Sequence, residues 1–500
     1  MSGFLSGVPG ERFPKASGRR PRTSLQRVAR GYASALVLWL GAAAGSTADE
    51  GVLQDVSSRA AAGIGLAQEI WELAELGYQE RESSGRLQSY LRGEGFALTS
   101  GVAGIPTAFV ATAGRGKPVI AILAEFDALP GLSQAATSRR QPLQDDAPGH
   151  ACGHHLFGAA STIAGAAVAA WLDRTGREGT IRLYGTPAEE GGSGKVYLTR
   201  AGLFEDVDAV LHWHPRDRND ASPYTTTANK SGRFTFHGIA AHAAGAPERG
   251  RSALDGVEAM NFMVNLMREH VPQETRIHYV ITDGGDAPNI VPEKAQVYYY
   301  VRHPVAETTL ALFERVVQAA EAGALGTGTR MEYEVMHGNY PLLPNNVLAR
   351  LVDENMRGLG GFSYDEDERR FAEEIRATLS GDLPPVASTE RVEPFAFRQN
   401  MGSTDVGDVS WNVPTVGFGT ATWVPGTPAH SWQAVAAGGT SIGHKGMLLA
   451  ARLLAVTATD LYQMPELLAA ARDEFEGRRG PDFKYEALLG DRQPPLDYRR

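Results

Sequence analysis

Between residues 118 and 420, short apolar runs alternate with helical stretches, and this alternation constrains the fold more than any other feature. The runs PVIAILAEF, TIRLYGTP, DAVLHWH and PTVGFGT are nearly continuous in apolar residues, and the helical stretch GAASTIAGAAVAAWLD lies between the first two. Buried parallel strands have this composition because helices cover both faces of their sheet. The alternation therefore predicts an α/β fold with a mostly parallel, doubly wound sheet.

The pattern changes between residues 227 and 337. Strand, helix, strand, strand, helix and strand are predicted for SGRFTFHG, SALDGVEAMNFMVNLMREH, TRIHYVIT, KAQVYYYVRH, TTLALFERVVQAAEA and RMEYEVMH. This βαββαβ order is typical of a ferredoxin-like unit. Because the parallel-sheet pattern resumes afterwards, we predict a domain at 227–337 inserted into a larger one at 49–226 and 338–475, followed by a C-terminal tail at 476–500.

Three further segments are interpreted from local pattern. Apolar residues recur at helical spacing from Val52 to Leu76, and ESSGRLQSYLRGEGF continues as a second helix that ends in glycines. The stretch from Gly361 to Val392 is charged and lacks clear periodicity, so it is predicted to be a surface excursion.

The first 48 residues differ in kind from the rest. Seven basic residues against one acid precede the apolar run YASALVLWLGAAAG and the small residues STA. A basic region, a short apolar region and a small-residue site together are typical of a secretory signal peptide, here with cleavage near Ala48. We therefore expect a secreted or periplasmic protein. The alternatives are an uncleaved anchor, or a cytoplasmic protein whose start codon is assigned too far upstream.

Charge and cysteine content narrow the classes of partner. The chain carries 48 basic and 58 acidic residues, and residues 1–48 hold seven and one of them, which leaves a net charge of about −16 for the rest. Nucleic acid is an unsuitable partner for such a chain because phosphate binding needs a basic face. The single cysteine, Cys152, excludes an intramolecular disulfide, and a metal is the obvious partner for a thiol in an oxidising compartment.

Four segments rich in potential metal ligands each follow a predicted strand. They are HACGHH, PAEEGG, HWHP and GTPAHSW. Ligands bind outside the carboxyl ends of the strands in open parallel sheets, so these segments can converge on one crevice. The sequence thus predicts a functional site at that edge.

Each segment alone allows a simpler explanation. Cys152 and His154 form a chelating pair for a transition metal, but a buried cysteine beside a hydrogen-bonded histidine is the commoner case. Glu189 and Glu190 would repel each other unless a cation neutralises one and leaves the other as a base; a solvated acidic loop is the alternative. His214 and His430 stand beside small or proline-containing turns, which makes a purely structural role less common.

Nine motifs, in order along the chain from about Val52 to Tyr462, resemble the M20 metallopeptidase family. They are ELGYQE, AEFDALPG, HACGHH, PAEEGGSGK, HWHP, AHAAGAPERGRSALDGVE, APNIVPEKA, GSTDVGD and PAHSW. The likeness is greatest to its aminoacylase-like amidohydrolases, which include p-aminobenzoyl-glutamate hydrolase and the auxin-conjugate hydrolases. The resemblance implies a metal-binding catalytic domain and an inserted lid or dimerisation domain.

The resemblance also implies roles for individual residues. Metal ligands of the family match Cys152, His154, Glu190, His214 and His430, its general base matches Glu189, and the acid that orients a ligand matches Asp127. His242 matches a histidine that reaches across a dimer to polarise the scissile carbonyl. Asn289 and Arg302 match lid positions that hold the substrate. His155 stands where many relatives have Asp or Asn, and it could contact the metal or line the pocket.

These roles imply an enzyme that hydrolyses a small N-acyl amino acid with water activated by two divalent cations, Zn²⁺ or Mn²⁺, with Co²⁺ or Ni²⁺ also possible. A homodimer through the inserted domain is expected. Arg233 and Arg302 could pair with a carboxylate, and Trp213, Trp423, Trp432 and the run from Tyr298 to Tyr300 could line an aromatic pocket, so we favour aromatic acyl groups. The rivals are deamination of an aromatic amine, a non-catalytic periplasmic binding protein, and catalysis by a Cys152 nucleophile.

Overall fold

The computed structural model describes residues 49–499, so the predicted export signal lies outside the described residues. A six-stranded sheet has the order β1-β2-β4-β3-β5-β12. Its strands are β1 (Ala97–Ser100), β2 (Phe109–Arg115), β3 (Val119–Ala124), β4 (Gly179–Gly185), β5 (Ala209–Arg216) and β12 (Thr415–Ala421). Strands β4, β3, β5 and β12 are parallel, and β1 and β2 form an antiparallel edge. The mostly parallel sheet is confirmed, while the edge pair was not predicted.

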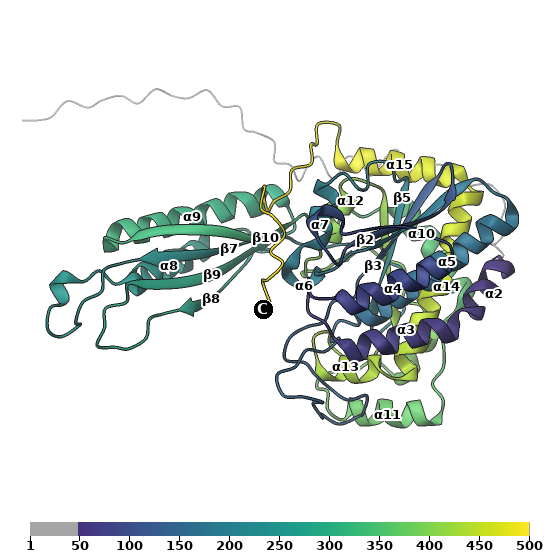
Figure 1. Cartoon of the computed structure of the whole chain (residues 1–500), viewed down its shortest axis with the longest axis horizontal. Coiled ribbons are helices and arrows are strands. Elements are labelled where there is room, and N and C mark those ends of the chain that lie inside the picture. Colours follow the sequence, from purple (N-terminus) through teal and green to yellow (C-terminus); the bar gives the residue numbers. More distant parts are fainter. Residues whose placement is uncertain (1–48, 500) are drawn as a thin grey trace, which may run out of the picture. The chain divides into compact units, whose positions relative to one another are not determined.

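Helices cover this sheet and supply most of the core. The central pair, α5 (His154–Thr175) and α14 (Ser441–Gln463), packs on β3 and β5. Helices α2 (Glu50–Ser58), α3 (Ala60–Leu73) and α4 (Arg81–Gly93) pack on α5; α10 (Asn346–Leu359) contacts α14, β12 and α15 (Pro465–Arg479); α13 (Trp432–Gly438) contacts α14; and α7 (Gly194–Arg200) pairs with α12 (Val406–Ser410). Figure 1 shows α7 and α12 on the side of the sheet opposite to α4 and α5.

Helix α5 is apolar enough to resemble a membrane span. It is, among the described residues, the one helix whose length and composition meet that criterion, with a mean hydropathy of 1.4 over its most apolar window. In the structure 89% of that window is buried inside the protein. Its alanine-rich sequence therefore serves close packing against the sheet, with Ile163, Val168 and Trp171 in the core.

The inserted region forms a second, four-stranded sheet with the order β10-β7-β9-β8. Its elements are β7 (Ala228–His237), α8 (Ala253–Met267), β8 (Arg276–Asp283), β9 (Lys294–His303), α9 (Ala306–Thr327) and β10 (Arg330–Asn339), and the strands pair antiparallel. Helices α8 and α9 pack together against β7 and β9, with a core of their own around Phe234, Met260 and Val316. The predicted βαββαβ order and ferredoxin-like unit are confirmed.

The charged stretch from Gly361 to Val392 is more ordered than predicted. It contains helix α11 (Glu366–Arg376), which a capping box between Asp365 and Glu368 begins. Ala372 and Ile375 are fully buried, in a small core that includes Val424. This helix was not predicted because only a narrow stripe of its surface is apolar.

Candidate active site

Four segments meet at the carboxyl edge of the parallel strands. Cys152 and His154 lie at the start of α5, Glu189 and Glu190 follow β4, His214 is on β5, and His430 follows β12. Gly153 has φ of 75°, and a Cβ there would lie 2.7 Å from the Pro215 side chain, so the turn requires glycine. The His430 amide donates to the Ala151 carbonyl at 2.9 Å, which joins the last segment to the first. The predicted convergence therefore occurs.

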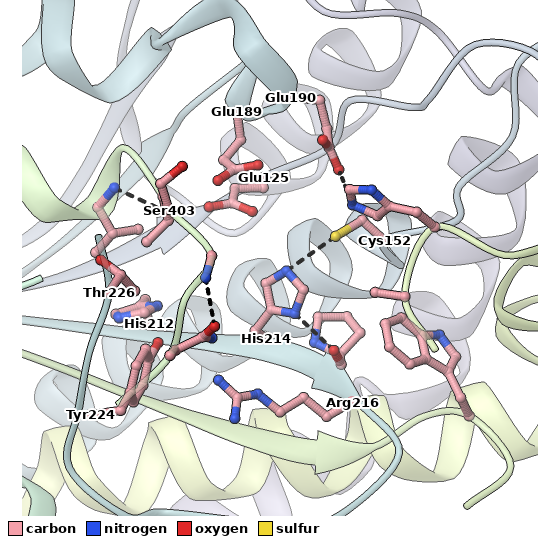
Figure 2. A pocket seen from close by; sticks show the side chains of 18 residues that line it. Glu125, Cys152, Glu189, Glu190, His212, His214, Arg216, Tyr224, Thr226 and Ser403 are labelled. Atoms are coloured by element: carbon pink, nitrogen blue, oxygen red, sulfur yellow. Dashed lines mark hydrogen bonds and ion pairs between the residues drawn. The ribbon is translucent and has the colours of Figure 1, made fainter. Parts of the chain in front are cut away.

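Cys152 belongs to two groups of potential ligand atoms. Cys152, His154 and His214 offer ligand atoms that all lie within 4.8 Å of one another, and so do Cys152, Glu190 and His430. The Cys152 sulfur is 3.4 Å from His214 Nε2, and Glu190 Oε1 is 3.1 Å from His430 Nε2. Figure 2 shows the sulfur between the His214 ring and the Glu190 carboxylate. The arrangement suits two cations that share one thiolate.

The histidine rings are oriented by their second nitrogens. His154 Nδ1 lies 2.8 Å from Asp127 Oδ1, and His214 Nδ1 lies 2.7 Å from the Pro215 carbonyl. The other oxygen of Asp127 accepts the Glu190 amide at 2.9 Å. Such contacts fix the tautomer of a ligating histidine and leave Nε2 free for a metal. Asp127 thus contacts both the His154 ring and the Glu190 backbone.

Two buried atoms show that the residues fit a metal pair. His154 Nε2 and Glu190 Oε1 make no regular hydrogen bond to the described residues, and their polar neighbours, Glu125 Oε2 at 3.0 Å and His430 Nε2 at 3.1 Å, are themselves potential ligands. Buried nitrogen and oxygen atoms of this kind are normally satisfied. Thiolate, imidazole and carboxylate are also the donor set that divalent transition metals take in proteins.

Glu189 lies beside these ligands but outside both groups that contain Cys152. Its carboxylate, with Glu125 and His154, forms a third close group, and the two glutamates face the cavity side by side (Figure 2). Burial, followed by repulsion from Glu125 and Glu190, raises the pKa of Glu189 well above its usual value. A carboxylate held next to metal ligands is suited to proton transfer.

Glu125 and Lys195 belong to the site and were missed by sequence reasoning. Glu125 is fully buried and forms an ion pair with Lys195 Nζ at 2.7 Å. Lys195 Nζ also forms an ion pair with Asp405, at 2.9 Å. Because this ammonium already neutralises Glu125, the third group is less suited to a cation than the two that share Cys152. Both residues stand in motifs of the family resemblance, AEFDALPG and PAEEGGSGK, where only the neighbouring acids were interpreted.

His155 takes neither of the roles considered for it. Its Nε2 lies 3.1 Å from the Gly438 carbonyl, its ring is 5.0 Å from that of His150, and the side chain is fully buried. Burial lowers its pKa well below the usual value, which favours the neutral ring. His155 therefore contributes to the packing behind the site.

The inserted region places only one of its three predicted residues at the site. His242 and Asn289 are exposed on two loops that pair with each other, with the Ala243 amide donating to the Asn289 carbonyl at 3.0 Å. His242 Nδ1 accepts the amides of Ala244 and Gly245, so its Nε2 is free. Arg302, by contrast, lines a cavity together with Glu189 and His430.

Two adjoining cavities open at the ligands. One, of about 280 Å³, is lined by Cys152, Glu189, Trp423 and Tyr224 (Figure 2). The other, of about 420 Å³, shares Glu189 and His430 and is lined by Tyr300 and Arg302. Of the other aromatic candidates, Trp213 is fully buried against Phe157, and Trp432 packs beside α11.

The fold and the site together define a hydrolase of the metallopeptidase class, with side chains suited to hold metal ions. The family profile described as peptidase dimerisation domain matches residues 224–327. The chain is 40% identical over 438 residues to one of the two subunits of p-aminobenzoyl-glutamate hydrolase from Escherichia coli K12, covering 82% of this chain and 91% of that one. It is 32% identical to a mouse Xaa-Arg dipeptidase, covering 82% and 88%.

A solved structure shares the fold. A dinuclear metal-binding peptidase of the M20 family from Bacillus subtilis superposes with a TM-score of 0.55 at 18% identity, covering 81% of this chain and 99% of that one. The chain belongs to the M20 metallopeptidase family, and it is an enzyme that acts on amide bonds.

Proposed function

We propose that this chain cleaves the amide bond of small N-acyl amino acids with an aromatic acyl group, by attack of an activated water. The observation that carries the proposal is Cys152 shared between two ligand groups, with Glu189 beside them and in neither. A binding protein would need no such base, which argues against the non-catalytic alternative. The named activity of the Escherichia coli relative supports the substrate class.

The metal ligands and Glu189 have separate roles in the reaction. Two divalent cations held by Cys152, His154, Glu190, His214 and His430 would lower the pKa of a water and polarise the amide carbonyl. Glu189 takes the proton of the attacking water as its oxygen bonds to the carbonyl carbon. It then delivers the proton to the amide nitrogen as the C–N bond breaks, which releases a carboxylate and an amine.

Substrate contacts are assigned from the two cavities. The acyl ring lies in the cavity with Trp423 and Tyr224, because flat aromatic walls favour a ring. The amino acid lies in the cavity with Arg302, whose guanidinium pairs with its carboxylate. Zn²⁺ fits the thiolate best, and Mn²⁺ fits the carboxylate and imidazole ligands.

We also propose a homodimer through the inserted domain, with His242 acting in the site of the partner subunit. His242 is exposed and lines neither cavity of its own chain, and its free Nε2 could donate to the oxygen that becomes negative in the tetrahedral intermediate. Asn289, on the paired loop, would likewise hold the substrate in the site of the partner subunit. We further propose export directed by residues 1–48, with cleavage near Ala48, which the N-terminal sequence of the mature protein would test.

The test is a product assay on defined metal forms. Protein stripped of metal and then loaded with Zn²⁺ or Mn²⁺ is incubated with a panel of N-acyl amino acids and dipeptides, and free amino acid and free ammonia are measured. We expect amino acid release that chelation abolishes. Ammonia without amino acid would favour the deaminase, and full activity after exhaustive chelation would favour a Cys152 nucleophile.

A further inference from the structure

The tail was predicted at 476–500, but helix α15 continues to Arg479, and the segment 480–499 that follows it reaches the candidate active site. Arg499 lines the cavity of about 420 Å³ together with Glu190, His430 and Arg302. Its guanidinium also donates to the Glu190 carbonyl, and its charge stacks 5.3 Å from the Tyr498 ring. A residue far along the chain from every motif of the family resemblance therefore lies at the substrate cavity.

Contacts along its length fix the path of this segment. Tyr485 donates to Asp408 at 2.7 Å, and Arg492 pairs with Glu334 on β10 at 2.6 Å. Nearer the site, the Leu496 carbonyl accepts Gln79 Nε2 at 2.7 Å, and the Tyr498 hydroxyl donates to the Glu190 carbonyl at 2.9 Å. The segment is therefore held both to the metal-binding sheet and to the inserted sheet.

A glycine of the M20-like motif ELGYQE makes room for it. A Cβ on Gly77 would lie 2.4 Å from the Tyr498 hydroxyl. The neighbouring Tyr78 ring meets Tyr498 edge to face at 5.6 Å. The local sequence at the site is thus matched to the presence of Tyr498, which sets the position of Arg499.

Three half-buried arginines each have one buried guanidinium nitrogen that makes no hydrogen bond to the described residues: Arg302 Nε, Arg233 Nε and Arg499 Nη1. Arg302 and Arg499 line the cavity of about 420 Å³, and Arg233 and Arg499 line a further cavity of about 180 Å³. None of the three arginines forms an ion pair within residues 49–499, whereas Arg492 in the same neighbourhood does. Arg302 and Arg233 stack instead on Tyr300 and Tyr298.

The buried donor atoms of these half-buried arginines indicate an anionic ligand. A buried charged donor without a hydrogen-bond partner costs free energy, and a carboxylate bound at the cavity would recover it. Burial lowers the pKa of Arg302, as expected for a guanidinium without a carboxylate beside it. Planar guanidinium groups bind carboxylates through two parallel hydrogen bonds, so two of them can hold two carboxylates.

We propose that Arg499 is a specificity-determining residue which, with Arg302, selects substrates whose amino acid carries a second carboxylate. The inference rests on the proposed function. Arg302 takes the α-carboxylate that every N-acyl amino acid has, and Arg499 takes the side-chain carboxylate of a dicarboxylic amino acid. A neutral side chain would leave Arg499 Nη1 without a carboxylate partner, which makes its binding weaker than that of an acidic side chain.

The test compares N-benzoyl-glutamate with N-benzoyl-glutamine, which differ in one charge at nearly equal size. In the metal-loaded enzyme, Arg499→Gln should lower kcat/KM for the glutamate substrate about 10- to 100-fold and change that for the glutamine substrate less than about threefold. Arg302→Gln should lower both. Lys484→Gln, which removes an exposed positive charge from the same segment, should lower neither.

A binding measurement separates failure of this inference from failure of the proposed function. Glutarate and butyrate are titrated calorimetrically into metal-loaded wild type and Arg499→Gln, and the variant should lose the preference for glutarate. Equal loss of kcat/KM for both substrates, or an unchanged glutarate preference, would overturn the inference. If wild type cleaves neither substrate while Arg499→Gln still abolishes the glutarate preference, the proposed function fails and the anion subsite stands.

Discussion

The metal-binding edge gathers its potential ligands within one chain, whereas the inserted region leaves two of its predicted site residues exposed. At the edge, ligands from four segments are already within 4.8 Å of a shared sulfur, and Asp127 and the Pro215 carbonyl orient the rings. Such preorganisation requires rigid elements and buried hydrogen bonds. The chemistry of the site is therefore built into the core of the larger sheet.

The inserted region presents apolar side chains that the described residues leave exposed. Its edge strand β8 exposes Val280 and Ile281, and α8 exposes Phe262, at 66%, and Leu266. The His242 and Asn289 side chains also face outward. Large exposed apolar side chains are common on association surfaces. The difference teaches that the potential metal ligands are gathered within one chain, whereas the roles proposed above for His242 and Asn289 require a second subunit.

The largest effect is expected from a substitution of Cys152 at the metal-binding edge. Because Cys152 belongs to both ligand groups, Cys152→Ala should weaken binding of both cations and reduce activity to background. His430→Ala removes a ligand from only one group and should leave about one tightly bound cation. Metal content after dialysis checks this. Equal metal content in the two variants would contradict a shared thiolate.

The next effect tests the base without disturbing the ligands. Glu189→Gln keeps the size of the side chain and should lower kcat by about 10²- to 10⁴-fold, with metal content unchanged. The matched control is Glu293→Gln, an exposed glutamate of the inserted region, which should keep full activity. Activity that survives in Glu189→Gln would show that another group moves the proton.

The sequence allowed some features of the molecule to be predicted and not others. The strands, the βαββαβ insertion and the ligand segments could be predicted because apolar periodicity and strand-end position carry that information. Glu125 and Lys195 were missed because a buried ion pair has no local pattern. Arg499 was missed for a similar reason, since its place depends on contacts that lie more than 300 residues away, such as Tyr498 to Glu190.

A smaller effect tests whether the inserted region completes a neighbouring site. His242→Ala should lower kcat about 10²- to 10³-fold, the cost of losing one donor to the developing oxyanion. Refolding this variant together with Glu189→Gln should restore about a quarter of wild-type activity, because mixed dimers then hold one intact site.

The control for this experiment alters the exposed edge strand β8, at which the dimer would form. Adding Val280→Asp to both variants places a charge on the exposed edge strand and should prevent the recovery, whereas Leu143→Asp, at an exposed apolar position of the larger domain, should not. No recovery in the unmodified mixture, despite demonstrated dimers, would mean that His242 acts within its own chain or not at all.

The smallest effect concerns the junction between the regions. Asp408 on α12 accepts the amide of Tyr340, which directly follows β10, and the hydroxyl of Tyr485 in the C-terminal segment. Burial raises its pKa to about 7 despite these two hydrogen bonds. A raised folded-state pKa means that the folded protein binds the proton more tightly than the unfolded chain between about pH 4 and pH 7.

The free energy of unfolding should therefore lose this contribution as pH rises through that window, by at most about 1.4 kcal/mol per pH unit. Asp408→Asn removes the titrating group and keeps its shape, so the variant should gain stability relative to wild type as pH rises from 5 to 7. Urea unfolding at fixed metal concentration measures the difference. A constant difference across the window would mean that Asp408 stays ionised, and that the two tyrosines hold a carboxylate at this junction.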